Sequence, residues 1–206
     1  RANNLPIILT EDMLYGKGLH KKCYLHPFDN NLCVKLATTG GGQEDINREI
    51  SYIKILNKRK KNYSILPKYY GCIETNLGTG YIFELIKNFD NTECKTLQDF
   101  LSDQKLLSEN FETVLKLLKT LKRELFDNEI ITLDLFAHNI LLQKVNKQTY
   151  QIRIVNDMGS AVLIPLEYYF HYFAKAKIQR VWNRFVESLN RKYPSILIEK
   201  IISEIK

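Results

Sequence analysis

The stretch that decides the fold is residues 131–142, ITLDLFAHNILL. It follows a long helical pattern, and its last three residues begin an apolar run typical of a strand. A phosphoryl-transfer enzyme needs a carboxylate to accept the acceptor's proton and an amide oxygen nearby to hold Mg²⁺. A tight loop with this spacing can aim Asp134 and Asn139 at one point, so we take them as candidate base and candidate metal ligand. An N-cap aspartate followed by a turn asparagine is the alternative.

A second acidic residue ends the next apolar run. Residues 154–159, IVNDMG, place Asp157 after that run and Gly159 two positions later. A carboxylate there can ligate Mg²⁺ through a hard oxygen, while glycine lets the backbone turn away. The segment occupies the D-F-G position of kinases, with Met158 in place of phenylalanine. We predict that Asp157 is a second metal ligand, although a turn aspartate would explain this segment taken alone.

A glycine-containing turn is predicted near the start of the chain. Residues 14–24, LYGKGLHKKCY, supply two glycines of the G-x-G-x-x-G pattern. Because backbone amides at a hairpin tip can cover phosphate oxygens, the segment 16–18 is a candidate nucleotide site: Gly16, Lys17, Gly18. Lys21 stands at the third glycine position, and Cys23 stands where a valine usually packs on adenine.

The next apolar run contains a lysine, Lys35, between Val34 and Leu36. Such a lysine either extends to solvent or has an anionic partner. Here it occupies the position of the lysine that holds the α- and β-phosphates of ATP. Its predicted partner is Glu49 on the following helix, and Glu44 on the same helix is a competing candidate.

The strand at residues 81–86, YIFELI, leads into the polar stretch between the two halves of the chain. In a two-lobed kinase this strand leads to the hinge. The backbone groups of Glu84 and Ile86 would then bond adenine, and Phe83 would flank the pocket.

The order of these elements decides the fold class, because each motif alone is weak. The motifs follow one another in the order found in kinases: glycine loop, strand lysine, helix glutamate, hinge strand, D-x-x-x-x-N and D-x-G.

The two halves of the chain differ in their expected secondary structure. Residues 1–86 read as strands with one helix from Glu44, after a flexible loop at 38–42 and before a turn at 78–80. Residues 87–206 read as helices around one hairpin, with the aromatic-rich segment 168–182 in the core and a docking surface as the alternative for that segment. We therefore predict an α+β, bilobal protein-kinase-like fold, with 1–86 as a small antiparallel sheet plus one helix and 87–206 as a reduced, mostly helical lobe.

Composition sets further bounds on the chain. Its 206 residues carry a net charge of +7, and no run approaches the roughly 18 apolar residues that span a bilayer. The first residues lack the layout of a signal peptide, and the four cysteines show no CxxC spacing, so we expect a cytoplasmic protein with reduced thiols. The basic clusters fall on predicted helices and are read as solvated faces; a nucleic-acid-binding regulator is the alternative that uses this charge.

Several segments also resemble one known family. They are residues 16–24, GKGLHKKCY; 32–35, LCVK; 65–71, ILPKYYG; 74–80, ETNLGTG; and 134–139, DLFAHN. Over residues 10–190 the sequence resembles the bacterial PhoP-regulatory-network protein YrbL family. The resemblance implies a protein-kinase-like fold, a bacterial origin and a cytosolic location, and it implies no particular acceptor.

Departures from ordinary protein kinases leave the acceptor open. Thr132 and Leu133 replace the His-Arg pair before the catalytic aspartate, no Ala-Pro-Glu follows Gly159, and the remaining segment is short for a peptide-binding lobe. The leading expectation is an ATP- and Mg²⁺-dependent phosphotransferase that acts on a protein hydroxyl or on itself. A small-molecule kinase, an AMP-transferring enzyme and a nucleotide-binding pseudokinase module are the alternatives.

Overall fold

Short apolar runs in the first part of the chain form an antiparallel sheet. In the computed structural model, which describes residues 6–162 and 164–206, five strands run in the order β1-β2-β3-β5-β4. They are β1 (Leu14–Lys17), β2 (Lys21–Leu25), β3 (Leu32–Ala37), β4 (Tyr69–Thr75) and β5 (Gly78–Glu84), preceded by the 3-10 helix η1 (Glu11–Met13). Strands β2 and β3 form an antiparallel hairpin, in which Tyr24 lies opposite Val34. The β4–β5 turn lies between Thr75 and Gly78, so the predicted turn at 78–80 was placed too late.

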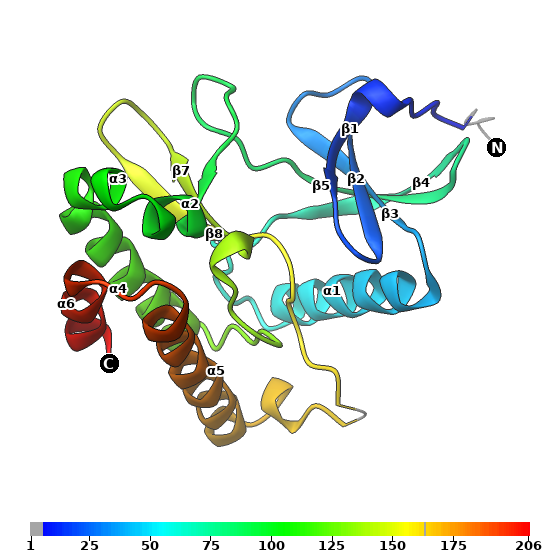
Figure 1. Ribbon diagram of the computed structural model, residues 1–206. Coiled ribbons are helices and arrows are strands. Elements are labelled where there is room, and N and C mark those ends of the chain that lie inside the picture. Colours follow the sequence, from blue (N-terminus) through cyan, green and yellow to red (C-terminus); the bar gives the residue numbers. More distant parts are fainter. Residues whose placement is uncertain (1–5, 163) are drawn as a thin grey trace. The chain divides into compact units, whose positions relative to one another are not determined.

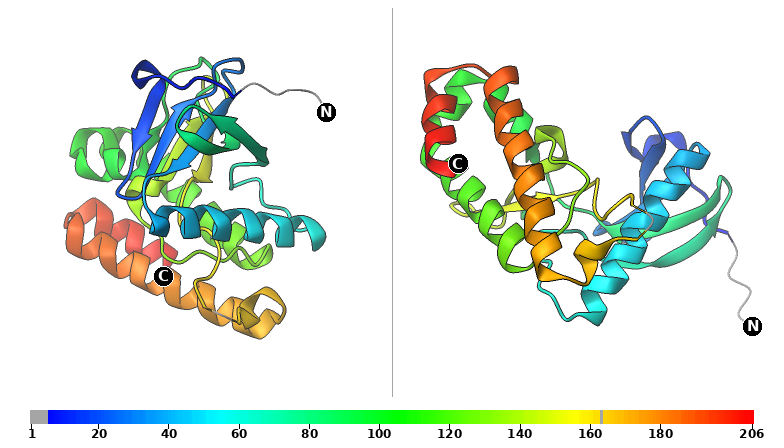
Figure 2. Two further views of the ribbon diagram at one scale, coloured as in Figure 1. Left: turned by 90° about the vertical axis from the view of Figure 1, so that its right-hand side faces the viewer. Right: turned by 90° about the horizontal axis from the view of Figure 1, so that it is seen from below.

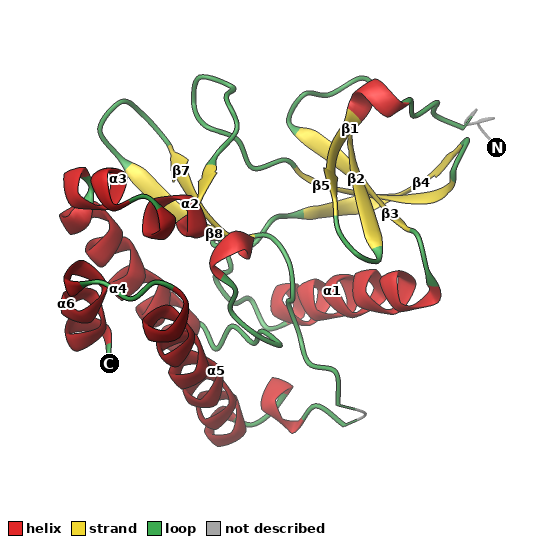
Figure 3. Ribbon diagram, in the orientation of Figure 1, coloured by secondary structure: helices red, strands yellow, loops and turns green. Residues whose placement is uncertain are grey.

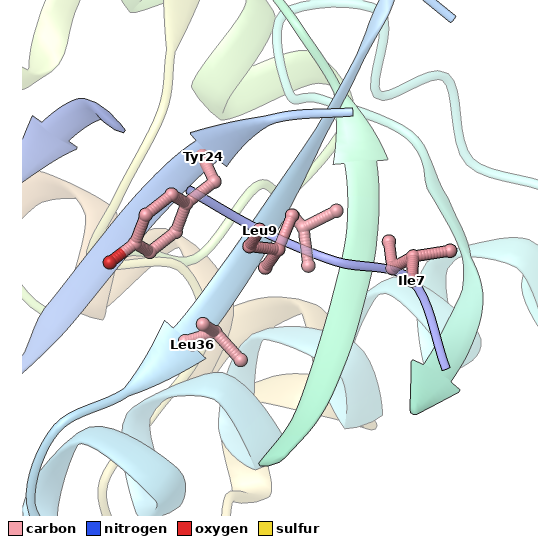
Figure 4. Close-up of a cluster of buried hydrophobic side chains, with 5 residues drawn as sticks. Ile7, Leu9, Tyr24 and Leu36 are labelled. Carbon is pink, nitrogen blue, oxygen red and sulfur yellow. The ribbon is translucent and has the colours of Figure 1, made fainter. Parts of the chain in front are cut away.

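The two faces of this sheet differ in character. Tyr24, Val34 and Leu36 form a buried cluster on one face, and Ile7 and Leu9 of the N-terminal segment complete it, as Figure 4 shows. The alternation of side chains along a strand puts residues such as Lys35 on the other face. One face of the sheet therefore packs in an apolar core, and the other face carries the charged side chain of Lys35.

Helix α1 (Gly40–Lys58) runs beside this sheet in Figure 1. It begins at the glycine run, so the predicted loop at 38–42 and helix start at Glu44 were wrong. The reason is contact with the β1–β2 turn: a Cβ on Gly42 would lie 1.9 Å from the carbonyl oxygen of His20. The backbone N–H of Thr38 also donates to that oxygen, at 2.9 Å. Glycine lets the helix start this close to the turn.

The rest of the chain is mostly helical, with one small sheet in the order β6-β7-β8. Its strands are β6 (Lys95–Thr96), β7 (Ile140–Lys144) and β8 (Tyr150–Ile154). Its helices are α2 (Leu97–Ser102), α3 (Gln104–Glu109), α4 (Phe111–Asp127), α5 (His171–Lys192) and α6 (Ile196–Ile205), with 3-10 turns η2 (Ala137–Asn139) and η3 (Leu166–Tyr168). Thr96 caps α2 in a reciprocal capping box with Asp99.

Helices α4, α5 and α6 pack against one another, as the views in Figure 2 show. Each has a buried apolar stripe, and the indole Nε1–H of Trp182 on α5 donates to the carbonyl of Ile205 on α6 at 3.0 Å. For the aromatic residues of 168–182, the prediction that they belong to the core is correct for Tyr168 and Trp182. Four neighbouring aromatic side chains are exposed: Tyr169, Phe170, Tyr172, Phe173.

The chain divides into two compact units, and Figure 3 shows helices and strands in both. The first unit runs to Lys54 and takes in Pro67–Ile86, while the second comprises Ile55–Leu66 and Lys87–Lys206. Part of the predicted first lobe, 55–66, thus groups with the second unit. The α+β class, with a small antiparallel sheet and several helices, is as predicted. Among the described residues, no helix has the length and apolarity to cross a membrane.

Candidate functional site

The first unit contains a buried ion pair between Lys35 of β3 and Glu49 of α1. Lys35 Nζ lies 3.0 Å from Glu49 Oε2, and the two residues are 8% and 0% exposed. The competing candidate, Glu44, is exposed. Burial alone would lower the pKa of Lys35, but the Glu49 carboxylate raises it; burial would raise the pKa of Glu49, but Lys35 and Lys21 lower it. Both groups are therefore held in their charged forms.

A second lysine shares the same carboxylate. Lys21 Nζ lies 3.0 Å from Glu49 Oε1, so Glu49 bridges β2 and β3 through its two oxygens. Lys21 occupies the third glycine position of the G-x-G-x-x-G pattern, where this sequence has no glycine. This departure supplies a counter-charge, because two cations compensate a fully buried carboxylate better than one.

The predicted phosphate-covering segment lies at the β1–β2 turn. Gly16 and Lys17 end β1, and the N–H of Gly18 donates to the carbonyl of Lys21 at 2.8 Å. A Cβ on Gly16 would meet nothing within 4 Å, so the space above this position is open. The Gly18 N–H is thus used within the hairpin, while Gly16 borders open space.

The predicted hinge residues lie at the end of β5. Phe83 is 0% exposed, and its ring lies 4.6 Å from Lys35 Nζ and 5.2 Å from the ring of Tyr69. The N–H of Glu84 donates to the carbonyl of Lys68 at 2.9 Å. This N–H group is therefore already used in a hydrogen bond within the first unit. Ile86 is 4% exposed. Phe83 thus packs against the Lys35 ammonium group in this structure.

The second unit brings Asn139 and Asp157 together. The Asn139 side-chain amide donates to Asp157 Oδ2 at 2.6 Å, and the Asn156 amide donates to Asn139 Oδ1 at 3.3 Å. Asn139 ends the η2 turn, and its carbonyl accepts from the N–H of Val155 at 3.0 Å. The two residues that the sequence assigned to one metal site are therefore in direct contact.

Backbone bonds fix the loop of Asp157 to the loop of Asp134. Leu133 N–H donates to the Asp157 carbonyl at 2.8 Å, and Gly159 N–H donates to the Ile131 carbonyl at 2.9 Å. Asp157 itself has φ +63°, a conformation that costs about 1–3 kcal/mol for a residue with a side chain. Gly159 follows at φ +90°, which glycine adopts readily. The backbone hydrogen bonds of Asp157 and Gly159 stabilise this unfavourable backbone conformation.

Asp134 faces a cation that sequence reasoning missed. Arg184 of α5 places its Nη2 3.8 Å from Asp134 Oδ1 and 3.0 Å from the carbonyl oxygen of Leu133. Asp134 Oδ1 also accepts from the N–H of Leu135 at 3.0 Å. Within residues 6–162 and 164–206, Oδ2 has no hydrogen-bond partner, and the side chain is 31% exposed. That oxygen is available to accept a proton.

The donor set of the Asn139–Asp157 pair fits Mg²⁺ better than a transition metal. Carboxylate and amide oxygens are hard ligands, and Mg²⁺ commonly takes only one or two carboxylates, filling its shell with water and phosphate oxygens. In the described part of the chain, no group of three or more His, Cys, Asp or Glu side chains could hold a metal ion. The residues present therefore fit a Mg²⁺ site in which the protein supplies only one or two oxygen ligands.

Lys21, Asn156 and Arg184 are the site residues that the sequence did not single out. Lys21 was noted only as the residue at the third glycine position. Arg184 lies on a distant helix, and no local pattern in the sequence links it to residue 134. Only the fold brings it to the loop.

Together these observations define an α+β protein with a buried lysine–glutamate pair in a sheet-and-helix unit and an Asp–Asn–Asp loop system in a mostly helical unit. The chain belongs to the family described as PhoP regulatory network protein YrbL, which matches residues 7–190. Two curated relatives, each named "Uncharacterized protein YrbL", come from Escherichia coli (strain K12) and Shigella flexneri. Each is 36% identical over 182 residues, which is 87% of this chain and 86% of the relative. The family resemblance found in the sequence is confirmed.

Proposed function

We propose that the chain is an ATP- and Mg²⁺-dependent phosphotransferase with a protein-kinase-like fold, which moves the γ-phosphoryl group of ATP to a hydroxyl acceptor. The observation that carries the proposal is the buried Lys35–Glu49 ion pair, 3.0 Å long, in a chain that also holds Asn139 and Asp157 in contact. A buried lysine held charged by a glutamate is a costly feature for stability alone. It is the arrangement that kinases use to hold nucleotide phosphates.

Each residue has a role that its surroundings support. Lys35 would bind phosphate oxygens through its ammonium group while Glu49 fixes its direction. Asn139 and Asp157 would hold Mg²⁺, which neutralises phosphate charge when it is bound. Asp134 would accept the proton of the acceptor hydroxyl on Oδ2, the oxygen that its described neighbours leave open, and Arg184 would keep Oδ1 in place.

The acceptor is proposed to be a hydroxyl of a protein or of the chain itself, with a small alcohol as the alternative substrate within the same enzyme class. A second candidate function is a nucleotide-sensing regulatory module without transfer. The family's description as part of the PhoP regulatory network favours this candidate over other non-enzymatic roles.

A labelling experiment tests the proposal. The purified protein is incubated with Mg²⁺ and γ-labelled ATP, with α-labelled ATP in parallel, and label is followed on protein and on released phosphate. Transfer of γ-label should fall by about 10² to 10⁴ in Asp134→Asn. The matched control is Asp127→Asn, at an exposed aspartate that ends α4, and it should keep full transfer.

The other outcomes separate the alternatives. Transfer of α-label would identify AMP transfer instead. Thermal stabilisation by Mg²⁺-ATP that is lost in Asp157→Ala, without any transfer, would favour the regulatory module. Neither binding nor transfer would refute the kinase interpretation of these residues.

A further inference from the structure

Two cysteines lie on the sheet face that carries Lys35. In the β2–β3 register Cys23 lies directly opposite Lys35, and Cys33 precedes Lys35 by two residues in β3. Residues directly opposite in an antiparallel pair, and residues two apart in a strand, point to the same side of the sheet. Cys33 is also opposite Phe83 of β5, whose ring lies against the Lys35 ammonium. The two thiols and the ammonium therefore form one cluster.

The two thiols differ in access. Cys23 is partly exposed, and its neighbour on β1 is Gly16, which has no side chain to cover it. Cys33 is only 4% exposed. A small molecule that approaches this face from the side of β1 would therefore meet the sulfur of Cys23 first.

The two thiols also differ in acidity. A hydrogen bond from the Cys33 thiol lowers the pKa of Cys23, and the positive charge of Lys35 lowers it further against the effect of burial. The same hydrogen bond and burial raise the pKa of Cys33 well above its usual range. The Cys33 sulfur also lies 3.9 Å from the carbonyl of Glu84, a second acceptor for its proton. Of the two cysteines, Cys23 is therefore the more readily deprotonated and also the more accessible. Because the thiolate is the reactive form of cysteine, Cys23 is the expected nucleophile.

We propose that Cys23 and Cys33 form a redox-active dithiol that reacts with hydrogen peroxide, Cys23 being the attacking sulfur and Cys33 the resolving one. In the first step the Cys23 thiolate attacks a peroxide oxygen, the O–O bond breaks, and hydroxide leaves. Cys23 becomes a sulfenic acid, oxidised by two electrons, while the peroxide is reduced. In the second step the Cys33 sulfur attacks that of Cys23, the S–S bond forms, and the S–O bond breaks. The hydroxyl group leaves as water with the Cys33 proton.

The register makes the resulting disulfide reversible. Cys23 and Cys33 are diagonal neighbours on the strand pair, a relation with a typical Cα separation of roughly 7–8 Å. Disulfides usually span about 4.4–6.8 Å between Cα atoms. Closing the bond must pull β2 along or towards β3, and the strain makes the bond easier to reduce. The strand that moves carries Lys21, and its neighbour carries Lys35, so oxidation acts on the residues around Glu49.

The test uses the reduced full-length chain, hydrogen peroxide as the probe, and no nucleotide. After brief exposure, free thiols are alkylated and the protein is analysed by intact and peptide mass spectrometry. The expected product has lost two hydrogens and contains a peptide linked through Cys23 and Cys33. The linked peptide must be absent in both Cys23→Ser and Cys33→Ser. Cys33→Ser should instead accumulate a sulfenic acid at Cys23 that a diketone reagent traps.

The chain offers a matched control in Cys72→Ser, which removes an exposed thiol on β4 and should leave the linked peptide unchanged. Retained far-ultraviolet circular dichroism shows that the serine variants remain folded. Oxidation mainly at Cys72, a stable sulfenic acid on Cys23 in the unmodified chain, or absence of any reaction would overturn the proposal. None of these readouts requires ATP, so they stay separate from the outcome of the transfer assay.

Discussion

The guanidinium of Arg184 lies 3.8 Å from the carboxylate of Asp134, although the two residues are far apart in the sequence. Arg184 also bonds the carbonyl of Leu133, so it holds both the side chain and the backbone of the loop. In ordinary protein kinases an arginine directly before the catalytic aspartate is part of this loop, and here Leu133 stands at that position. In the proposed phosphotransferase, Arg184 of helix α5 would therefore act as a positioning residue for Asp134.

Replacing Arg184 should impair turnover more than nucleotide binding. In Arg184→Ala we expect kcat for the proposed transfer to fall about tenfold, equivalent to about 1.4 kcal/mol, because Asp134 is less well oriented. Thermal stabilisation by Mg²⁺-ATP should be unchanged. Arg180→Ala, one turn earlier on α5 and exposed, is the control that should leave both readouts unaltered. Equal losses in kcat and in nucleotide stabilisation would show that Arg184 has a general structural role instead.

The two lysines on Glu49 should contribute unequally to stability. Removing one partner of a buried pair typically costs about 3–5 kcal/mol, and we expect Lys35→Met to lie near the lower end because Lys21 remains. Lys21→Ala should cost about 1 kcal/mol, since Lys21 is partly exposed. Urea unfolding measures both. Lys22→Ala is the neighbouring control: its partner Glu11 lies 3.7 Å away with its side chain 80% exposed, and its loss should cost at most about 0.5 kcal/mol.

Gly42 and Gly41 should respond oppositely to the same substitution. Gly42→Ala would place a Cβ 1.9 Å from the His20 carbonyl oxygen, so the turn or the helix start must shift, at about 1–3 kcal/mol. Gly41→Ala meets only the Thr39 hydroxyl at 3.9 Å and should gain up to about 1 kcal/mol from helix propensity. Thermal unfolding of the pair provides the comparison. Equal stabilisation by both alanines would mean that α1 does not start against this turn.

Glu129 should make the stability of the chain depend on pH in the acid range. It is 5% exposed, and although burial would raise its pKa, bonds from His171, Lys61 and Arg59 lower it to about 2. A carboxyl with a depressed pKa stabilises the fold above its unfolded value of 4.5, and this contribution is lost as pH falls towards 2. Glu129→Gln should therefore cost about 3 kcal/mol at pH 7 and much less near pH 2–3.

Urea unfolding of both proteins at the two pH values measures this difference. Glu204→Gln is the control, because the pair of Glu204 with Lys119 is exposed and should contribute little at either pH. A Glu129→Gln deficit that is the same at both pH values would assign the loss to packing instead of charge.

Local patterns predicted most elements of the fold. The apolar run around Lys35 and the helical pattern that precedes residue 131 are both local signals, so strand β3 and helix α4 were predicted correctly. The helix start failed because three glycines favour a loop, and only the close approach of His20 explains why α1 begins there. The two-residue strand β6 was also missed, because its pairing with β7 depends on a segment more than forty residues away.

The candidate site was predicted in part for the same reason. Lys35 with Glu49, and Asn139 with Asp157, were assigned from spacing along an ordered series of motifs, and the structure brings both pairs together. Arg184 and the second oxygen contact of Glu49 depend on tertiary contacts, which no spacing records. The sequence motifs therefore predict the residues of the two pairs, whereas the residues that contact them from elsewhere in the chain are found only in the folded structure.

The boundary inside α1 has a consequence for how the chain can be divided. The second unit includes Ile55–Leu66, which precede the last two strands of the first unit in the sequence. Ile65 accepts the N–H of Ile154 at 2.7 Å, and Leu66 accepts a bond from Arg153. A protease cut after residue 86 would leave these partners on separate fragments, and a ribosome delivers Ile65 long before Ile154 exists. The helical unit can therefore be completed only after both of its segments have been synthesised, and neither half is expected to be a self-sufficient module for expression or for exchange between proteins.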